Sequence, residues 1–291
     1  MPEIKKVLIV RKLSTYETFS LEKSNLSKKQ LEKYEKYHLE NLETIEKVKA
    51  VLENLSIKYK IKKRTEVKKI SKQDLVISIG GDGTFFDTAR LVKDIPIISI
   101  NSNKMGSVAL FSSMDISNIE KKLYKLLTKP LIPLFLNRMQ IILNNKILDD
   151  FILNDILIAN ASPVNMSKYI ISIDGIRESQ RSSGVWISTA AGSTGGIFSA
   201  GAKALPLGSK RLQFLIREPV NKRLYKYSKG FIKEGQKFNI ISKMPNGKIY
   251  LDGSTKYYSF NIQDKCSLVI SPHPLKILGF DKKKRNSYVS S

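Results

Sequence analysis

Apolar and polar residues follow two different patterns along this 291-residue chain, and the change comes near residue 130. Before it, short apolar runs typical of buried strands alternate with longer amphipathic segments. Residues 27–56 carry apolar side chains at steps of three and four, which predicts one long helix with an apolar stripe. Alternating strands and helices of this kind are typical of a parallel sheet, so we predict a Rossmann-like α/β N-terminal domain.

We expect this domain to cover residues 1–130. The stripe on the helix at 27–56 could pack on the sheet or pair with a second copy, and we favour the sheet, with His38 packed rather than ligating. Residues 11–26 are polar and are expected to be irregular. The other predicted elements are strands at 1–10, 57–61, 74–79 and 95–100 and helices at 84–93 and 115–128.

After a linker at 129–133 the pattern becomes that of a mostly β domain, which we assign to residues 131–271. Turn residues such as Asn144-Asn145 and Asp174-Gly175 separate or end its apolar runs. The segment 272–291 could return to the first domain, and its polar end is expected to fray. The predicted strands are 138–143, 147–159, 169–174, 184–189, 211–217, 237–242, 248–251 and 267–271.

The net charge is +24, from 50 Lys and Arg against 26 Asp and Glu. Such a field attracts polyanions. However, the lysines are dispersed and no recognisable nucleic-acid module accompanies them, so we attribute the charge to biased composition and expect no nucleic-acid partner.

Two absences in the sequence bear on its compartment. No apolar run approaches the ~18 residues that a membrane span needs, and the N-terminus does not read as a signal peptide. Cys266 is the only cysteine, so no internal disulfide can form. We therefore expect a cytoplasmic protein with no membrane partner.

The most informative motif is Gly-Gly-Asp-Gly-Thr at residues 80–84, directly after the predicted strand at 74–79. Glycines let the backbone approach a ligand closely, and the N-terminus of the next helix favours an anion such as phosphate. The central carboxylate, Asp82, suits a group that handles a metal ion or accepts a proton from a hydroxyl attacking phosphorus. The alternative is a simple turn capped by Asp82. The loop is not a Walker A motif, because no Gly-Lys-Ser/Thr follows.

Two polar clusters mark the second domain. Asn154 and Asp155 interrupt an apolar run, and an Asn offers donors and acceptors that suit a base edge or a ribose. Residues 188–201 are rich in Gly, Ser and Thr, whose hydroxyls can bond sugar or phosphate oxygens. Each cluster could also be structural, as a strand bulge or a tightly packed helix start.

Taken in this order, the three motifs resemble the NAD kinase family over about residues 74–253, and segments 212–219 and 251–253 also look like family segments. The resemblance implies an N-terminal α/β domain, a mostly β C-terminal domain that binds NAD, and a homodimer or homotetramer. It implies transfer of a phosphoryl group from ATP, or from polyphosphate, to the 2′-hydroxyl of the adenosine ribose of NAD(H), giving NADP(H).

On the donor side, the resemblance implies that Asp82 is the catalytic residue that orients or deprotonates the 2′-hydroxyl. It implies that Gly81, Gly83 and Thr84 cradle the donor phosphates through their N–H groups. Mg²⁺ or another divalent metal would bridge these phosphates. No side chain is assigned as a direct metal ligand.

On the acceptor side, Asn154 and Asp155 fit the Asn-acid pair that holds the adenosine part in the family. Thr194 and Ser199 fall where the family contacts the nucleotide.

The sequence departs from the family pattern at four places. Asp155 stands where Glu is usual, and Ser183-Gly184 stands where Asp-Gly is usual. Gly195-Gly196 replaces a common Ala-Tyr, and segment 102–106 departs from a shorter turn. Because the glycine loop is intact, phosphoryl transfer is better supported than NAD as the acceptor.

Two other functions stay open at this point. A lipid kinase of the diacylglycerol or sphingosine type shares the glycine loop, although no exposed amphipathic anchor is evident. A nucleotide-binding regulator without catalysis is the second, because the changes at Ser183 and Gly195-Gly196 fall in the acceptor region. The phosphoryl donor, the preference for NAD or NADH, the oligomer number and the regulation do not follow from the sequence.

Overall fold

The computed structural model describes residues 4–22, 26–130, 132–221 and 225–290. The chain divides into two compact units, one formed by residues 1–135 with 275–291 and one by residues 136–274. The predicted domain boundaries at 130 and 272 lie a few residues from these limits.

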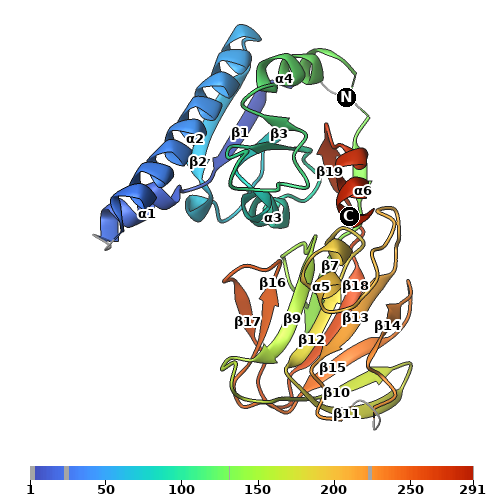
Figure 1. Ribbon diagram of the computed structural model, residues 1–291. Helices are drawn as coiled ribbons and strands as arrows, with labels where there is room; N and C mark the ends of the chain where they lie inside the picture. Colours follow the sequence, from blue (N-terminus) through green and yellow to red (C-terminus); the bar gives the residue numbers. More distant parts are fainter. Residues whose placement is uncertain (1–3, 23–25, 131, 222–224, 291) are drawn as a thin grey trace. The chain divides into compact units, whose positions relative to one another are not determined.

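The first unit contains a sheet whose described strands follow the order β2-β1-β3-β4-β19-β6, with β5 paired to β4 (Figure 1). Its strands are β1 (Lys6–Arg11), β2 (Lys58–Lys63), β3 (Leu75–Ile79), β4 (Ile97–Asn101), β5 (Met114–Asp115), β6 (Leu134–Leu136) and β19 (Leu275–Leu278). The pairings of β1 with β2, β1 with β3, β3 with β4 and β4 with β19 are all parallel, which confirms the predicted α/β class.

Helices pack on both faces of this sheet. The described helices of the unit are α1 (Thr15–Glu22), α2 (Lys28–Asn54), α3 (Asp82–Leu91), α4 (Ile119–Thr128) and α6 (Lys282–Ser290), with a short 3₁₀ turn η1 (Arg64–Glu66). Helices α2 and α4 pack on the face that carries Ile9, Ile77 and Ile98. Because parallel crossovers are right-handed, the connections β1–α2–β2 and β3–α3–β4, which run in opposite directions along the sheet, place α2 and α3 on opposite faces.

The apolar stripe of α2 is only partly covered. Ile45, Val48 and Leu52 are buried against the sheet, as predicted. Toward the N-terminus of the helix, Leu31 and Leu42 remain 43% and 39% exposed. The stripe therefore packs on the sheet along its second half.

The expectation that residues 11–26 are irregular is wrong, because helix α1 (Thr15–Glu22) forms there. Ser14 and Glu17 cap it reciprocally: the Glu17 N–H donates to Ser14 Oγ at 3.1 Å and the Ser14 N–H donates to Glu17 Oε2 at 2.9 Å. Ser14 Oγ also hydrogen-bonds His38 Nδ1 at 3.0 Å, so His38 is a packed side chain.

The second unit contains two antiparallel sheets. In the described residues the first has the order β11-β10-β15-β18-β7-β8 and the second the order β14-β13-β12-β9-β16-β17. The first comprises β7 (Met139–Leu143), β8 (Lys146–Ile147), β10 (Ser167–Ile173), β11 (Ile176–Ser182), β15 (Phe238–Ser242) and β18 (Lys265–Ile270). The second comprises β9 (Asp155–Asn160), β12 (Gly184–Ser188), β13 (Leu212–Arg217), β14 (Lys229–Ile232), β16 (Gly247–Leu251) and β17 (Tyr257–Ser259).

Side chains from both sheets form one apolar core, which includes Ile156, Tyr169, Phe214 and Phe238. This arrangement confirms the mostly β second domain. Between β12 and β13 the chain makes a 3₁₀ turn, η2 (Gly192–Thr194), and a single helical turn, α5 (Gly196–Ser199).

Several predicted elements differ from the structure. The strand predicted at 147–159 is broken, because the chain leaves β8 at Ile147 and starts β9 only at Asp155. The helix predicted at 84–93 spans Asp82–Leu91. Strand β11 was missed because its sequence, IRESQRS, is polar; the turn Asp174-Gly175, with φ of 49° and 90°, folds it back onto β10. The terminal segment expected to fray contains α6.

Candidate functional site

The glycine loop leaves the carboxyl end of β3, beside the carboxyl end of β1. From β1 the chain continues to β2 on one side, and from β3 it continues to β4 on the other side. Ligands of parallel α/β sheets bind at the carboxyl edge where the direction of the connections changes in this way. A Cβ on Gly80 would lie 2.5 Å from Thr84 Oγ1, and one on Gly81 would lie 2.5 Å from Ser107 Oγ. Glycine at both positions therefore allows close packing, against Thr84 at Gly80 and against the Ser107 side chain at Gly81.

Asp82 is the first residue of α3, directly after the Gly81 N-cap. Its carboxylate accepts two main-chain hydrogen bonds, from the Leu110 N–H at 2.9 Å and from the Phe111 N–H at 3.1 Å. Burial raises the pKa of Asp82, while these two N–H groups and the Lys284 ammonium act in the opposite direction. The carboxylate is thus held in one orientation, and its raised pKa brings it closer to that of a useful general base.

The other loop residues occupy different environments. Gly83 is exposed in the first turn of α3, and Arg64 Nη1 lies 3.7 Å from the position of its missing Cβ. Thr84 is buried beneath Gly80, and its N–H donates to the Gly81 carbonyl at 3.1 Å. Gly83 is therefore more accessible to a ligand than Thr84.

Two cations flank the loop. Lys12 follows β1, its N–H donates to the Ile79 carbonyl at 2.9 Å, and its Cβ lies 3.2 Å from where a Gly80 Cβ would be. Burial and the neighbouring Arg64 lower the pKa of Lys12. Arg64 also pairs with Asp87 of α3 at 3.3 Å. A lysine and an arginine beside a helix N-terminus form a suitable environment for phosphate.

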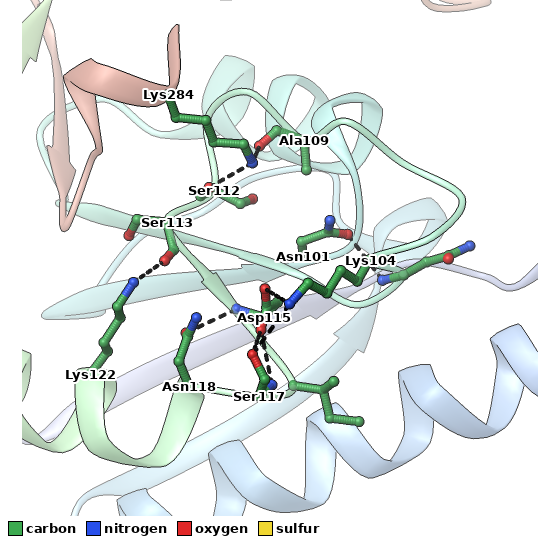
Figure 2. Close-up of polar contacts among 12 residues, drawn as sticks. Asn101, Lys104, Ala109, Ser112, Ser113, Asp115, Ser117, Asn118, Lys122 and Lys284 are labelled. Carbon is green, nitrogen blue, oxygen red and sulfur yellow. Dashed lines mark hydrogen bonds and ion pairs between the residues drawn. The ribbon is translucent and has the colours of Figure 1, made fainter. Parts of the chain in front are cut away.

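The segment that follows β4 returns to the glycine loop. Asn101 Nδ2 donates to the Ser107 carbonyl at 3.2 Å, and Ser107 packs against Gly81. Further along, Asp115 accepts from the Ser117 N–H at 2.9 Å and pairs with Lys104 at 3.3 Å (Figure 2). These contacts give residues 101–118 a defined path beside the loop.

In the second unit, the Asn154-Asp155 pair and the Gly/Ser/Thr turn come together. The Asn154 carbonyl accepts from the Thr189 N–H at 3.0 Å. A Cβ on Gly192 would lie 2.1 Å from the same carbonyl oxygen, so this position accepts only glycine. The Asn154 N–H donates to Asp252 Oδ1 at 2.8 Å, which ties the start of β9 to the turn after β16.

Asp155 carries a buried carboxyl group whose pKa is strongly raised. It is 2% exposed, and its Oδ1 finds no hydrogen-bond partner in the part of the chain that the structure describes. Burial and, second, the charge of Asp252 raise the pKa of Asp155 to about 7. Asp252 is tied to it directly, since the Asp252 N–H donates to the Asp155 carbonyl at 2.8 Å. The Asp155 carboxyl group therefore has an oxygen without a hydrogen-bond partner among the described residues and a pKa near neutral pH.

Thr194 and Ser199 differ in accessibility, since Thr194 is buried in η2 and Ser199 is exposed at the end of α5.

Two of the departures from the family pattern lie in this unit. At Gly195-Gly196, a Cβ on Gly196 would lie 3.4 Å from the Trp186 ring. Ser183, in place of the expected acid, donates its N–H to the Arg217 carbonyl at 3.0 Å.

The sequence motifs did not single out Lys12, Arg64 or Asp252 as site residues. Lys12 and Arg64 lie outside any motif, and only the placement of β1 and η1 beside the glycine loop brings them to it. Asp252 carried a signal as the first residue of an Asp-Gly turn, with φ of 50°, but not as a partner of Asn154 and Asp155.

Within the described residues, no three or more His, Cys, Asp or Glu side chains gather in a way that could hold a metal ion. A divalent ion bound mainly through substrate phosphates needs only one or two protein carboxylates, and Asp82 is the carboxylate that the glycine loop contains.

Comparison with known proteins decides the family. Residues 2–130 match the family described as ATP-NAD kinase N-terminal domain. A probable NADH kinase of Oryza sativa subsp. japonica is 30% identical over 259 residues, which cover 79% of this chain and 78% of the rice protein. The chain belongs to the NAD kinase family.

Solved structures show that this family member also has the family fold. An NAD kinase of Archaeoglobus fulgidus, solved in complex with ATP, superposes with a TM-score of 0.72 at 20% identity and covers 98% of each chain. A yeast NADH kinase complexed with NADH superposes with a TM-score of 0.77 at 14% identity, over 100% of this chain and 88% of its own. In the described part of this NAD kinase family member, no helix combines the length and the apolar character needed to cross a membrane.

Proposed function

We propose that this enzyme transfers the γ-phosphoryl group of ATP to the 2′-hydroxyl of the adenosine ribose of NAD(H), giving NADP(H) and ADP. The observation that carries the proposal is the position of Asp82, at the N-terminus of α3 and the carboxyl edge of a parallel sheet. Its carboxylate is held there by the N–H groups of Leu110 and Phe111. Family membership supports the same reaction class.

In the proposed reaction, the ribose 2′-oxygen attacks the γ-phosphorus while the bond from that phosphorus to the β–γ bridging oxygen breaks. The proton of the hydroxyl moves to Asp82, and ADP leaves with the electron pair of the broken bond. A positioned general base contributes about 10²–10⁴ in rate. Burial raises the pKa of Asp82, which increases its basicity for this proton transfer.

We assign the donor phosphates to the glycine loop of Gly81, Gly83 and Thr84. The Thr84 N–H already donates to the Gly81 carbonyl, so Thr84 shapes the loop and the exposed Gly83 offers the more accessible N–H group. Lys12 and Arg64 stand beside this loop and would neutralise part of the triphosphate charge. Mg²⁺ or another divalent ion, bound to the phosphate oxygens, would supply further charge neutralisation. Inorganic polyphosphate offers the same anionic chemistry and is the alternative donor.

We assign the acceptor nucleotide to the cluster around Asn154, Asp155, Thr194 and Ser199. The unsatisfied Oδ1 of Asp155 supports this assignment, because a buried acceptor without a partner suits a ligand hydroxyl or amino group. The exposed hydroxyl of Ser199 is available for a second contact at the end of α5.

We also propose a cytoplasmic homodimer or homotetramer. Cys266 is the only cysteine of the sequence and can form no internal disulfide, which supports a reducing compartment. Light scattering of the purified protein measures the oligomer number.

The test is formation of NADP⁺ or NADPH by the purified protein, with NAD⁺ and NADH each combined with ATP or polyphosphate in the presence of Mg²⁺. We expect product with at least one pair and a loss of about 10²–10⁴ in kcat for Asp82→Asn, with unchanged thermal unfolding. A near-wild-type rate for Asp82→Asn would remove the role given to that residue. Absence of product from folded protein that binds ATP would favour another acceptor, and diacylglycerol in mixed micelles would be tested next.

A further inference from the structure

The turn that holds Asp82 is itself held from the far end of the chain. Residues 109–112 form a turn, in which the Ser112 N–H donates to the Ala109 carbonyl at 3.0 Å. The two residues between them, Leu110 and Phe111, supply the N–H groups that bind the Asp82 carboxylate. The position of this turn therefore determines the orientation of the proposed base.

This turn contains an unfavourable backbone conformation. Ala109 has a φ of 44° and is 1% exposed. The left-handed region is sparsely populated by residues other than glycine and persists only where the surroundings impose it. Contacts outside the turn must therefore contribute to holding it.

Lys284 of α6 makes such contacts. Its Nζ donates to the Ala109 carbonyl at 2.7 Å and to the Ser112 carbonyl at 3.2 Å, so one ammonium group joins both ends of the turn (Figure 2). Burial raises the pKa of Asp82, and the Lys284 charge opposes part of that rise because it favours the ionised carboxylate. Lys284 thus acts on Asp82 in two ways, by its hydrogen bonds to the 109–112 turn and by the electrostatic effect of its charge.

The start of α6 is fixed to the same turn by a second contact. Phe280, just before the helix, packs on Phe111 with ring centroids 5.8 Å apart, and Phe111 stacks on Phe85 of α3 at 5.1 Å. Asp281 Oδ1 accepts from the Lys283 N–H at 2.9 Å, which caps the helix that carries Lys284. The C-terminal segment therefore contacts the turn through the Phe280 ring and through the Lys284 ammonium group.

We propose that Lys284 is a positioning residue for phosphoryl transfer, which holds the 109–112 turn so that the Leu110 and Phe111 N–H groups orient Asp82. This inference rests on the proposed role of Asp82. It gives the C-terminal helix, which follows the second unit in the sequence, a direct part in shaping the candidate active site of the first.

The test compares Lys284→Met, Lys284→Gln and Lys284→Arg in the full-length protein. Lys283→Met is the matched control, because it removes the same charge from the same helix at an exposed position. We expect Lys284→Met to lower kcat about 10- to 100-fold, since a displacement of about 1 Å at a catalytic group costs up to that much, with KM for both substrates within about twofold. Lys284→Arg should recover most of the rate, and Lys284→Gln, which keeps a donor without the charge, should fall between.

The pH profile supplies a readout that simple destabilisation would not move. The charged groups acting on Lys284 are Asp82, Asp115, Asp281 and Lys122. Loss of the ammonium removes a charge that favours ionised Asp82, so the acidic limb of kcat/KM should move to higher pH in Lys284→Met and return in Lys284→Arg.

Hydrogen exchange tests the same contact without catalysis. The Leu110 and Phe111 amides should exchange faster in Lys284→Met and Lys284→Gln than in Lys283→Met. Wild-type kinetics, pH profile and exchange in both Lys284→Met and Lys284→Gln would overturn this inference while leaving Asp82 in place. An active Asp82→Asn variant would instead overturn the proposed role of Asp82, whatever the Lys284 variants show.

Discussion

The Asp252 carboxylate accepts a hydrogen bond from the Asn154 N–H at 2.8 Å, across 98 residues of sequence. In return, the Asp252 N–H donates to the Asp155 carbonyl at 2.8 Å. One acid thus fixes the start of β9, where Asn154 and Asp155, two of the four proposed acceptor-binding residues, lie. The same acid adds its charge to the environment of Asp155.

Replacing Asp252 should separate its two effects. Asp252→Ala leaves the Asn154 N–H without its acceptor and should lower the free energy of unfolding by about 1–3 kcal/mol. Asp252→Asn keeps an acceptor oxygen and should cost less, while both variants lower the pKa of Asp155 because a negative neighbour is lost. Urea unfolding at pH 7 measures the first effect. Equal losses in the two variants would contradict the hydrogen-bond explanation.

The raised pKa of Asp155 predicts a pH dependence of stability. Its folded-state pKa of about 7 lies above the ordinary value of 3.8, so between these values the folded protein binds one more proton than the unfolded chain. The contribution of Asp155 to the free energy of unfolding is fully present below about pH 4. It decreases by up to about 1.4 kcal/mol per pH unit as the pH rises from there, and it is lost once the pH has passed through 7.

Asp155→Asn, which has no carboxyl group to titrate, should remove that part of the slope. Urea midpoints of wild type and variant between pH 5 and 8 provide the measurement, and their difference isolates this residue from the other titrating groups. Parallel curves for the two proteins would show that Asp155 does not titrate in this range.

Gly192→Ala should be strongly destabilising. Its Cβ would lie 2.1 Å from the Asn154 carbonyl oxygen, so the backbone of the turn or of β9 must shift, at a cost of about 1–3 kcal/mol or more. Gly208→Ala is the control, since nothing lies within 4 Å of its Cβ. The melting temperatures of the two variants are compared, and a similar small change in both would contradict the predicted clash.

The contact between Gly81 and Ser107 can be tested by a double substitution. Gly81→Ala places its Cβ 2.5 Å from Ser107 Oγ, which should displace the loop and lower kcat. Ser107→Ala removes that oxygen and leaves its own Cβ 3.4 Å away, so the double variant should recover activity relative to Gly81→Ala. Kinetics of all four proteins give the coupling. No recovery in the double variant would mean that another contact limits the loop.

The cations beside the glycine loop should act on the phosphoryl donor. Lys12→Met and Arg64→Met should each raise KM for ATP about tenfold, as expected for the loss of a charge-assisted contact, with little change in KM for the acceptor. Lys60→Met, at an exposed position of β2, controls for the general loss of positive charge. An equal rise in KM for ATP in all three variants would point to the overall field of the protein instead.

Much of the fold follows from local pattern. Continuous apolar runs placed β1, β3 and β4, which are buried on both faces of the sheet, and steps of three and four residues placed α2. In the second unit, apolar runs bounded by turn residues placed most of the strands. Helix α1 and strand β11 were not predicted, and the causes are local. Helix α1 forms in spite of its polar composition because Ser14 and Glu17 cap it. Strand β11 is polar, and its position depends on the turn at Asp174. The break before β9 depends on partners distant in sequence, which no local pattern contains.

The sequence by itself determined the chemistry available at the candidate site: a glycine loop with a central acid, an Asn-acid pair and a hydroxyl-rich turn, in an order typical of one family. Only the tertiary structure decided which groups hold them. Lys12, Arg64, Asp252 and Lys284 reach the motifs from other elements, because sheet topology and hydrogen bonding bring together residues that are far apart along the chain. The raised pKa values of Asp82 and Asp155 have the same origin, since burial is a property of the folded protein.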